Sequence, residues 1–194
     1  GDRADMLHIL LDGVVELYGS FKDREGTLIL MHPVRAFILA AIVQDLPYLM
    51  SARTISPARV LMIPAPVAHR LLREDAAFND AMMRALAEEF RRVLKALKSH
   101  KLRDGTERIA AYLLELRHNS ADADVVTLPA DRKTIATYLG MTRENLSRSL
   151  QTVREHGAAV RGNEVRFRDV EKLRALARPS RLIDDLDPDP DPQP

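Results

Sequence analysis

Gly140 separates two short segments whose apolar residues recur at helical spacing, and this arrangement constrains the fold more than any other feature of the chain. The apolar residues before and after the glycine are Ile135, Ala136, Leu139, Leu146, Leu150 and Val153. Each set would form the buried face of one helix, and a glycine permits a tight turn between them. The pattern therefore predicts a helix-turn-helix.

The second predicted helix begins with a polar face. Thr142 can cap it by accepting a hydrogen bond from a free backbone N–H. Arg can donate two bonds to a guanine edge, Glu can accept from a cytosine amine, and Ser can bond to either kind of base. We expect the base-reading residues to be Arg143, Glu144, Ser147 and Arg148. The alternative is the solvated face of an ordinary helix, but the surrounding turn and buried faces favour reading of a DNA major groove.

A short hairpin is predicted after this motif. Ala158 to Arg161 and Glu164 to Phe167 flank Gly162-Asn163, as expected for the wing of a winged helix. Arginines near DNA contact phosphates, which adds affinity and salt dependence without sequence choice. The expected phosphate contacts are Thr142, Lys133, Arg161, Arg166 and Arg168. A winged helix that binds protein instead of DNA is the remote alternative, and the wing arginines argue against it.

A long helix is predicted before the DNA-reading part. Phe78 to Leu102 holds no Gly or Pro, and good helix formers dominate it. Apolar residues recur at alternating spacings of three and four, which is typical of a coiled-coil seam. We expect a parallel homodimer with the seam Met82, Leu86, Phe90, Val93 and Leu97. The alternative is a helix packed on its own domain. Asp104-Gly105-Thr106 should end this helix, provide a hinge and cap the next one, Glu107 to Leu116.

The first 64 residues are predicted to be rich in β-strands. Asp12-Gly13 is a hairpin signal between the first two predicted strands, and Phe37 to Val43 reads as a short helix. Several short strands with turns indicate a small antiparallel barrel or roll. The predicted strands are Met6 to Leu11, Val14 to Tyr18, Thr27 to Met31, Ser51 to Ile55 and Arg59 to Ile63, followed by a helix from Pro66 to Arg73.

Composition excludes several classes of site. The chain has no cysteine, which excludes disulfides, thiolate zinc sites and cysteine-held iron–sulfur clusters within it. Its net charge of +1 includes five Asp within 184–194, so the rest carries +6, which suits nucleic acid. No apolar run reaches the roughly 20 residues that span a bilayer, and no catalytic or nucleotide-binding motif is present. We expect a cytoplasmic protein that is not an enzyme.

The order of these parts resembles the cyclic-AMP receptor / fumarate-nitrate regulator family of bacterial transcription factors. The resemblance rests on Glu144-x-x-Ser147-Arg148, on Asp104-x-Thr106-x-Arg108-Ile109-Ala110 and on Ala52 through Pro64. It implies an α+β chain: a β-roll like a cyclic-nucleotide-binding domain, a long dimerisation helix and a C-terminal winged helix-turn-helix. The expected bounds are 1–77, 78–103 and 104–178, followed by a disordered acidic, proline-rich tail at 179–194. An N-terminal piece of the roll is expected to be absent.

The resemblance also implies a mechanism. A small effector in the roll would reorient the two winged helices of a homodimer so that both recognition helices enter adjacent major grooves. The Glu-x-x-Ser-Arg set is similar to the branch that reads TTGA-like inverted repeats. The partners implied are double-stranded DNA, a second copy of the chain and RNA polymerase, with no membrane.

The effector is where the chain departs from the family pattern. Cyclic-nucleotide binders carry a Gly-Glu-x-x-Gly cassette and an Arg-Ser pair, whereas this chain has no Gly or Glu in His32 to Ala40 and reads Met50-Ser51 at the pair. Cyclic AMP would lose its charge partner, unless Arg35 or Arg53 replaced it. The expected pocket is Phe37, Leu39, Met50, Ser51, Val93 and Leu94. The alternatives are a haem that binds nitric oxide or carbon monoxide, with His32 or His8 as ligand, and no effector at all.

Overall fold

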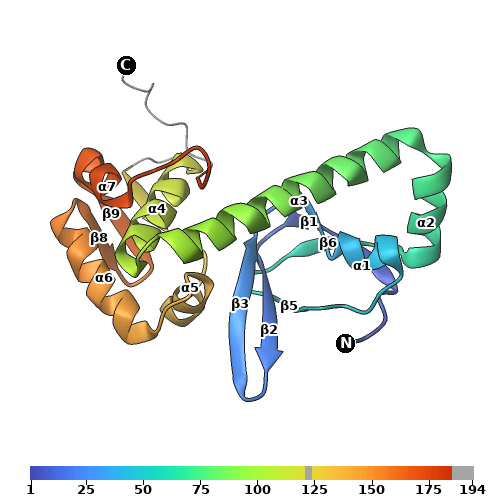
Figure 1. Ribbon diagram of the computed structural model, residues 1–194, viewed down its shortest axis with the longest axis horizontal. Coiled ribbons are helices and arrows are strands. Elements are labelled where there is room, and N and C mark those ends of the chain that lie inside the picture. The colour runs from blue at the N-terminus through green and yellow to red at the C-terminus, as the bar shows by residue number, and fades with distance from the viewer. Residues whose placement is uncertain (121–123, 185–194) are drawn as a thin grey trace. The chain divides into compact units, whose positions relative to one another are not determined.

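The computed structural model describes residues 1–120 and 124–184, and its contacts divide the chain into two compact units, Gly1–Arg92 and Val93–Pro194 (Figure 1). The long helix α3 (Ala76–Leu102) contributes residues to both units. Of the predicted tail at 179–194, residues 185–194 lie outside the described part, whereas residues 179–184 are described and form a turn in which the Ser180 N–H donates to Asp184. Among the described residues, no helix is both long enough and apolar enough to cross a membrane.

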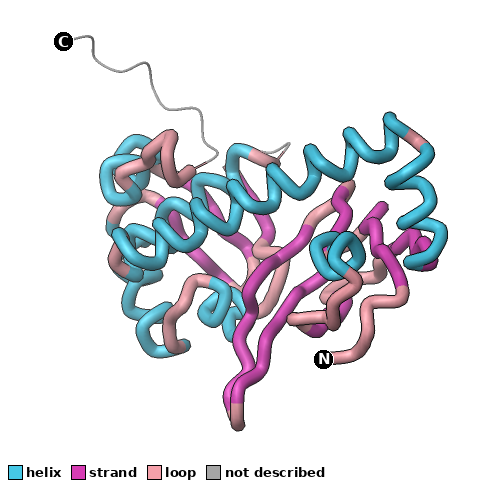
Figure 2. The backbone as a smooth tube through the Cα atoms, turned by 45° about the vertical axis from the view of Figure 1, so that its right-hand side comes forward, coloured by secondary structure: helices cyan, strands magenta, loops and turns pink. Residues whose placement is uncertain are grey.

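The first unit contains two antiparallel three-stranded sheets, which can be followed in Figure 2. One sheet has the strand order β4-β1-β6 and the other has the order β3-β2-β5. The strands are β1 (Met6–Asp12), β2 (Val15–Phe21), β3 (Arg24–Met31), β4 (Arg35–Phe37), β5 (Ser51–Thr54) and β6 (Arg59–Pro64). The expected antiparallel roll is therefore confirmed.

The prediction of a hairpin at Asp12-Gly13 is wrong, because β1 and β2 do not pair. β1 pairs with β4 and β6, whereas β2 pairs with β3 and β5, so the glycine connects two different sheets. Gly13 has a φ of +86°, and a Cβ there would lie 2.3 Å from the carbonyl oxygen of Pro57. Gly13 thus allows the chain to pass close to the connection between β5 and β6. That connection also joins the two sheets, because β5 and β6 belong to different sheets.

Two other boundaries differ from the prediction. The hairpin of this unit joins β2 to β3 through Lys22 and Asp23, because both strands continue further than the polar composition suggests. The first helix, α1 (Leu39–Gln44), begins two residues later than expected. Phe37 is the last residue of β4, and Ile38 has a φ of 61°, which separates strand from helix.

Apolar residues from both sheets and from the helices form the core of this unit. One cluster packs Leu10, Val15, Leu17, Met31 and Phe37 between strands. A second cluster joins β1 to α1, α2 (Ala65–Glu74) and the start of α3, through Leu7, Leu39, Ile42, Ala68 and Met82. The beginning of α3 is therefore part of the core of the roll.

The second unit is a three-stranded sheet with helices around it. Its strands have the order β7-β9-β8, and the bounds are α4 (Gly105–His118), β7 (Val125–Thr127), α5 (Arg132–Tyr138), α6 (Arg143–Glu155), β8 (Ala158–Arg161), β9 (Glu164–Phe167) and α7 (Val170–Ala177). Six consecutive residues of α4, Ile109 to Leu114, are buried. The predicted winged helix-turn-helix is confirmed, and Asp104 caps α4 through a capping box with Glu107.

Candidate DNA interface and sensor residues

A side-chain cap begins each of the helices α5 and α6, and a glycine lies in the turn between them. Thr142 Oγ1 accepts from the backbone N–H of Asn145 at 3.2 Å, and Asp131 Oδ1 accepts from that of Thr134 at 2.8 Å. Gly140 has a φ of +64°, a conformation that favours glycine. Ile135, Ala136, Leu146 and Val153 are buried as predicted. These local bonds fix the direction in which α6 leaves the turn.

All four predicted base-reading side chains are exposed on the first two turns of α6: Arg143, Glu144, Ser147 and Arg148. The pKa of Glu144 is lowered, first by a hydrogen bond from its own backbone N–H, then by the Thr142 hydroxyl and by the charges of Arg143 and Arg148. Its carboxylate is therefore an ionised acceptor at neutral pH. The set offers two donors of Arg type, a carboxylate and a hydroxyl on one exposed face.

Residues of α4 support this helix from behind. The hydroxyl of Thr106 donates to Ser149 Oγ at 3.1 Å, and Ser149 is buried on the face of α6 that also carries Leu146 and Val153. Arg108 Nε donates to the carbonyl of Leu139 at 2.9 Å, just before the turn. Sequence reasoning did not assign Ser149 this role, although its spacing from Leu146 and Val153 places it on the buried face.

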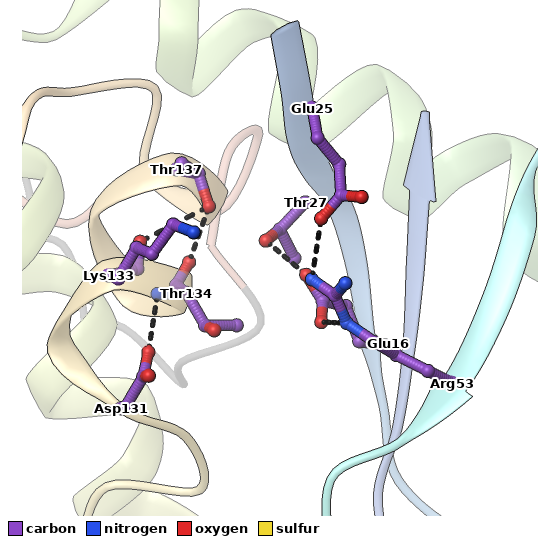
Figure 3. Close-up of polar contacts among 8 residues, drawn as sticks. All are labelled: Glu16, Glu25, Thr27, Arg53, Asp131, Lys133, Thr134 and Thr137. Atoms are coloured by element: carbon purple, nitrogen blue, oxygen red, sulfur yellow. Dashed lines mark hydrogen bonds and ion pairs between the residues drawn. The ribbon is translucent and has the colours of Figure 1, made fainter. Parts of the chain in front are cut away.

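The wing is a β8–β9 hairpin with arginines on its surface. A hollow of about 250 Å³ is lined by Ala159, Arg161, Glu164, Arg166 and Arg168. Arg166 already forms an exposed ion pair with Glu164 at 3.0 Å, while Arg161 and Arg168 are also exposed. Lys133 is exposed in the first turn of α5, beside the Asp131 cap (Figure 3). All five predicted phosphate-contacting residues thus lie on the surface of the second unit.

In the first unit, the polar side chains bind each other. Glu16 on β2 is 2% exposed, and its two carboxylate oxygens accept from Thr27 Oγ1 and from Arg53 Nε, each at 2.6 Å (Figure 3). Arg53 also pairs with Glu25 at 2.8 Å and lies over the ring of Tyr18. The hydrogen bond to Glu16, above all, raises the pKa of the Arg53 guanidinium. Sequence reasoning treated Arg53 as a substitute phosphate ligand and missed this network.

Arg35, the other candidate partner for an anionic effector, is also engaged. Its guanidinium donates to Glu89 Oε2 on α3, and both side chains are mostly buried. Carboxylates already neutralise the charge of both arginines, so an anion bound to either would compete with a carboxylate. The arginines near the family's ligand region therefore serve the fold of this unit.

The predicted effector-pocket residues lie in different environments. Phe37 and Leu39 are buried in separate core clusters, and Met50 packs against the Phe37 cluster, whereas Ser51 is exposed on β5. Val93 and Leu94 are exposed residues of the second unit. A hollow of about 280 Å³ in the first unit lies between α2 and α3, and none of the predicted pocket residues lines it.

The two histidines considered as haem ligands differ in their surroundings. The His8 ring stacks on Phe37 with 5.2 Å between centroids and lies 6.3 Å from Tyr48, and burial lowers its pKa. Its Nδ1 is buried without a hydrogen-bond partner. His32 is exposed, and neither histidine lines the hollow between α2 and α3. His8 packs with Phe37 stacked on its ring, and neither histidine lines either of the two hollows described above.

The predicted dimer seam is divided. Met82 is buried in the core of the roll and Leu86 packs against the same cluster, so Met82 is corrected to a core residue of its own unit. Phe90, Val93 and Leu97 remain 65%, 50% and 51% exposed. The exposed part of the predicted seam thus begins at Phe90, about two helical turns after Met82.

A roll that precedes a winged helix-turn-helix defines a class of effector-controlled DNA-binding proteins. Family models agree: the cyclic nucleotide-binding domain matches residues 1–75, and the Crp-like helix-turn-helix domain matches residues 107–176. The CRP-like cAMP-activated global transcriptional regulator of Mycobacterium tuberculosis is 26% identical over 184 residues, which cover 92% of this chain and 82% of the relative.

Solved structures show the same likeness. A regulatory protein from Silicibacter pomeroyi is 30% identical with a TM-score of 0.64, and the match covers 92% of this chain and 80% of that chain. A CRP-family transcriptional regulator from Thermus thermophilus is 25% identical with a TM-score of 0.77, and 93% and 91% of the two chains are covered. The chain belongs to the CRP/FNR family of transcriptional regulators, and the relatives that it resembles are regulators and not enzymes.

Proposed function

We propose that this regulator is a cytoplasmic homodimer that reads a TTGA-like inverted repeat in double-stranded DNA. The observation that carries the proposal is the exposure of Arg143, Glu144, Ser147 and Arg148 on one face of the capped helix α6. A helix that follows a turn and carries such donors and acceptors on its first two turns suits a DNA major groove.

The chemistry of each side chain assigns its base. Arg148 donates to the guanine edge, Glu144 accepts from the cytosine amine, and Ser147 bonds to a thymine or adenine edge. Arg143 contacts either a base or a phosphate. Thr142, Lys133 and the three wing arginines bind phosphates and set the register of the protein on the duplex.

The exposed part of the α3 seam supports the homodimer. Phe90, Val93 and Leu97 form an apolar stripe at alternating spacings of three and four residues on a helix of 27 residues. Pairing with a second copy removes this stripe from water. An inverted repeat then matches the two-fold symmetry of the protein, and promoter-bound dimers contact RNA polymerase.

The effector is a ligand other than cyclic AMP, or the regulator acts without one. Arg35 and Arg53, the remaining candidates to neutralise a cyclic phosphate, are paired with Glu89 and with Glu16 and Glu25. A buried or partly buried phosphate without a charge partner is costly. The cyclic-AMP activation named for the mycobacterial relative is therefore not transferred to this chain.

A binding experiment tests both parts. Fluorescence anisotropy of the full chain with a TTGA inverted-repeat duplex is expected to give tight binding, and a scrambled duplex of equal length only weak, salt-sensitive binding. Adding millimolar cyclic AMP should change neither the affinity nor the melting temperature. Equal affinity for the two duplexes would refute the DNA assignment, and a cyclic-AMP-dependent rise in melting temperature would refute the effector assignment.

A further inference from the structure

The junction between α3 and α4 is closed by the segment Arg178–Asp184, which follows α7. Arg103, one of the two residues between the helices, makes two parallel bonds to Asp184: Nη1 to Oδ1 at 2.7 Å and Nη2 to Oδ2 at 2.6 Å. The side chains are only 6% and 10% exposed. A nearly buried, bidentate ion pair between residues 81 positions apart is a specific contact and differs from a chance meeting of surface charges.

Further hydrogen bonds surround this pair. The backbone N–H of Ser180 donates to Asp184 Oδ2 at 2.7 Å, and Lys95 Nζ on α3 donates to the carbonyl of Asp184 at 3.0 Å. Arg103 also donates to the carbonyl of Arg178 at 3.1 Å. We name Arg178–Asp184 the clamp segment. It binds α3 at Lys95 and at the junction residue Arg103.

The opposite side of the junction reaches the helix-turn-helix. Arg108 Nη1 donates to the carbonyl of Arg103 at 2.6 Å, and its Nε donates to the carbonyl of Leu139. His100, in the last turn of α3, lies against Gly140: a Cβ on that glycine would be 2.7 Å from His100 Cδ2. The last turns of α3 therefore touch the turn that sets the direction of α6.

Gly105, the predicted hinge, allows a close contact at this junction. It is the first residue of α4, and a Cβ there would lie 3.3 Å from Met141 Cε and 3.7 Å from Ser149 Oγ. The glycine lets α4 pack closely on the helix-turn-helix, and the capping box of Asp104 and Glu107 fixes the start of the helix.

We propose that Asp184 is a positioning residue for DNA reading: the clamp segment, which continues from α7, fastens the last turns of α3 to the winged-helix domain so that the two move as one body. This inference rests on the proposed homodimer, since Val93 and Leu97 of the seam lie on the same part of α3. In the dimer, the clamp holds the two recognition helices at the separation of the half-sites. Loss of the clamp leaves each winged helix intact but lets the distance between the two recognition helices vary.

The test is half-site spacing, which a contribution to stability alone would not alter. Asp184→Asn keeps the shape of the side chain and removes its charge. It should lower the affinity for the correctly spaced repeat about tenfold, because binding of the second half-site depends on effective concentration. Its preference for this repeat over one with two added base pairs should fall by a similar factor. Binding to a single half-site should stay unchanged.

Matched variants complete the experiment. Asp80→Asn removes the same charge from an exposed pair with Arg84 and should behave like the wild type. Arg103→Lys keeps the charge but loses the bidentate geometry, so it should relax spacing to an intermediate degree. Full spacing preference in a folded Asp184→Asn protein would overturn the proposal.

A second measurement separates failure of the clamp from failure of the proposed function. Hydrogen exchange of the free protein should become faster at the amides of 103–108 in Asp184→Asn and stay unchanged in Asp80→Asn. If the wild-type protein does not prefer the inverted repeat, the proposed function is refuted. The clamp proposal is then tested by hydrogen exchange alone. If hydrogen exchange at 103–108 is unchanged in Asp184→Asn, the clamp proposal is refuted even if the protein binds the repeat.

Discussion

Helix α6 of the second unit and the sheets of the roll use their charged side chains in opposite ways. On α6 of the second unit, Arg143, Glu144 and Arg148 point to solvent from a helix start that is fixed by the cap of Thr142. In the roll, Glu16 is buried and bound by Arg53 and Thr27, and Arg35 is bound by Glu89. Exposed charges on a rigid element are available to a partner, whereas paired charges in a core are already satisfied.

This difference supports the proposal that the chain keeps the DNA-reading chemistry of the family and differs from cyclic-AMP binders in its roll. A buried carboxylate needs its partner, so Arg53 cannot leave Glu16 to bind a phosphate without stranding a charge. The exposed side chains on α6 need no charged partner within the protein, because water solvates them and DNA can replace that water. Sensing of an anion and reading of DNA are therefore separable in this fold.

The largest expected effect comes from removing a base contact. Arg148→Ala should weaken binding to the inverted repeat by about 1–3 kcal/mol for each half-site, since a bidentate guanine contact is worth that much discrimination. Salt-sensitive binding to a scrambled duplex should persist, because phosphate contacts remain. Anisotropy titrations with both duplexes measure the difference. Arg154→Ala, which removes an exposed arginine of the last turn of α6, is the control. Retained sequence preference in Arg148→Ala would contradict the assignment.

A smaller loss, of stability instead of DNA binding, is expected in the roll. Arg53→Ala should lower the free energy of unfolding by about 2–4 kcal/mol, slightly below the range for a fully buried pair because the guanidinium is half exposed. The double variant Glu16→Leu, Arg53→Met should recover most of this loss, since no buried charge is left alone. Urea unfolding gives the values.

Arg59→Ala is the control for the roll. Its exposed pair with Asp12 spans 3.9 Å, and its removal should change stability by less than about 0.5 kcal/mol. If Arg53→Ala is as mild as this control, the charges of the roll are not structural and the comparison of the two units breaks down.

The smallest expected effect concerns the cap of α5. Asp131→Ala should cost about 1 kcal/mol, as loss of an N-cap usually does. The hydrogen bond from the Thr134 backbone N–H, above all, lowers the pKa of Asp131 in the folded protein. A carboxyl with a lowered folded pKa stabilises above its unfolded pKa of about 3.9, and this contribution disappears as pH falls through the folded value.

The stability difference between wild type and Asp131→Ala should therefore be constant from neutral pH to about pH 5 and shrink at lower pH. Urea unfolding at several pH values measures it, with Asp80→Ala as the exposed control. A difference that grows on acidification would have the wrong sign for a capping carboxylate.

Local sequence determined the DNA-reading half to within a residue or two. The caps of Asp104, Thr142 and Asp169 bind amides only two or three positions ahead, and the wing strands flank Gly162-Asn163 directly. The residues that make these contacts are close together in the sequence, so periodicity and capping rules locate the helices and the hairpin.

Partners far apart in the chain were decided by the tertiary structure alone. Strand β1 pairs with β4 and β6 and not with β2, which follows it in the chain, and Met82 packs in the core of the roll instead of lying on the seam. Arg53 met Glu16 across 37 positions, and Asp184 met Arg103 across 81. The physical reason is that burial and ion pairing depend on which surfaces meet in space. A sequence states which side chains can pair, and only the packed sheets and helices bring one particular pair together.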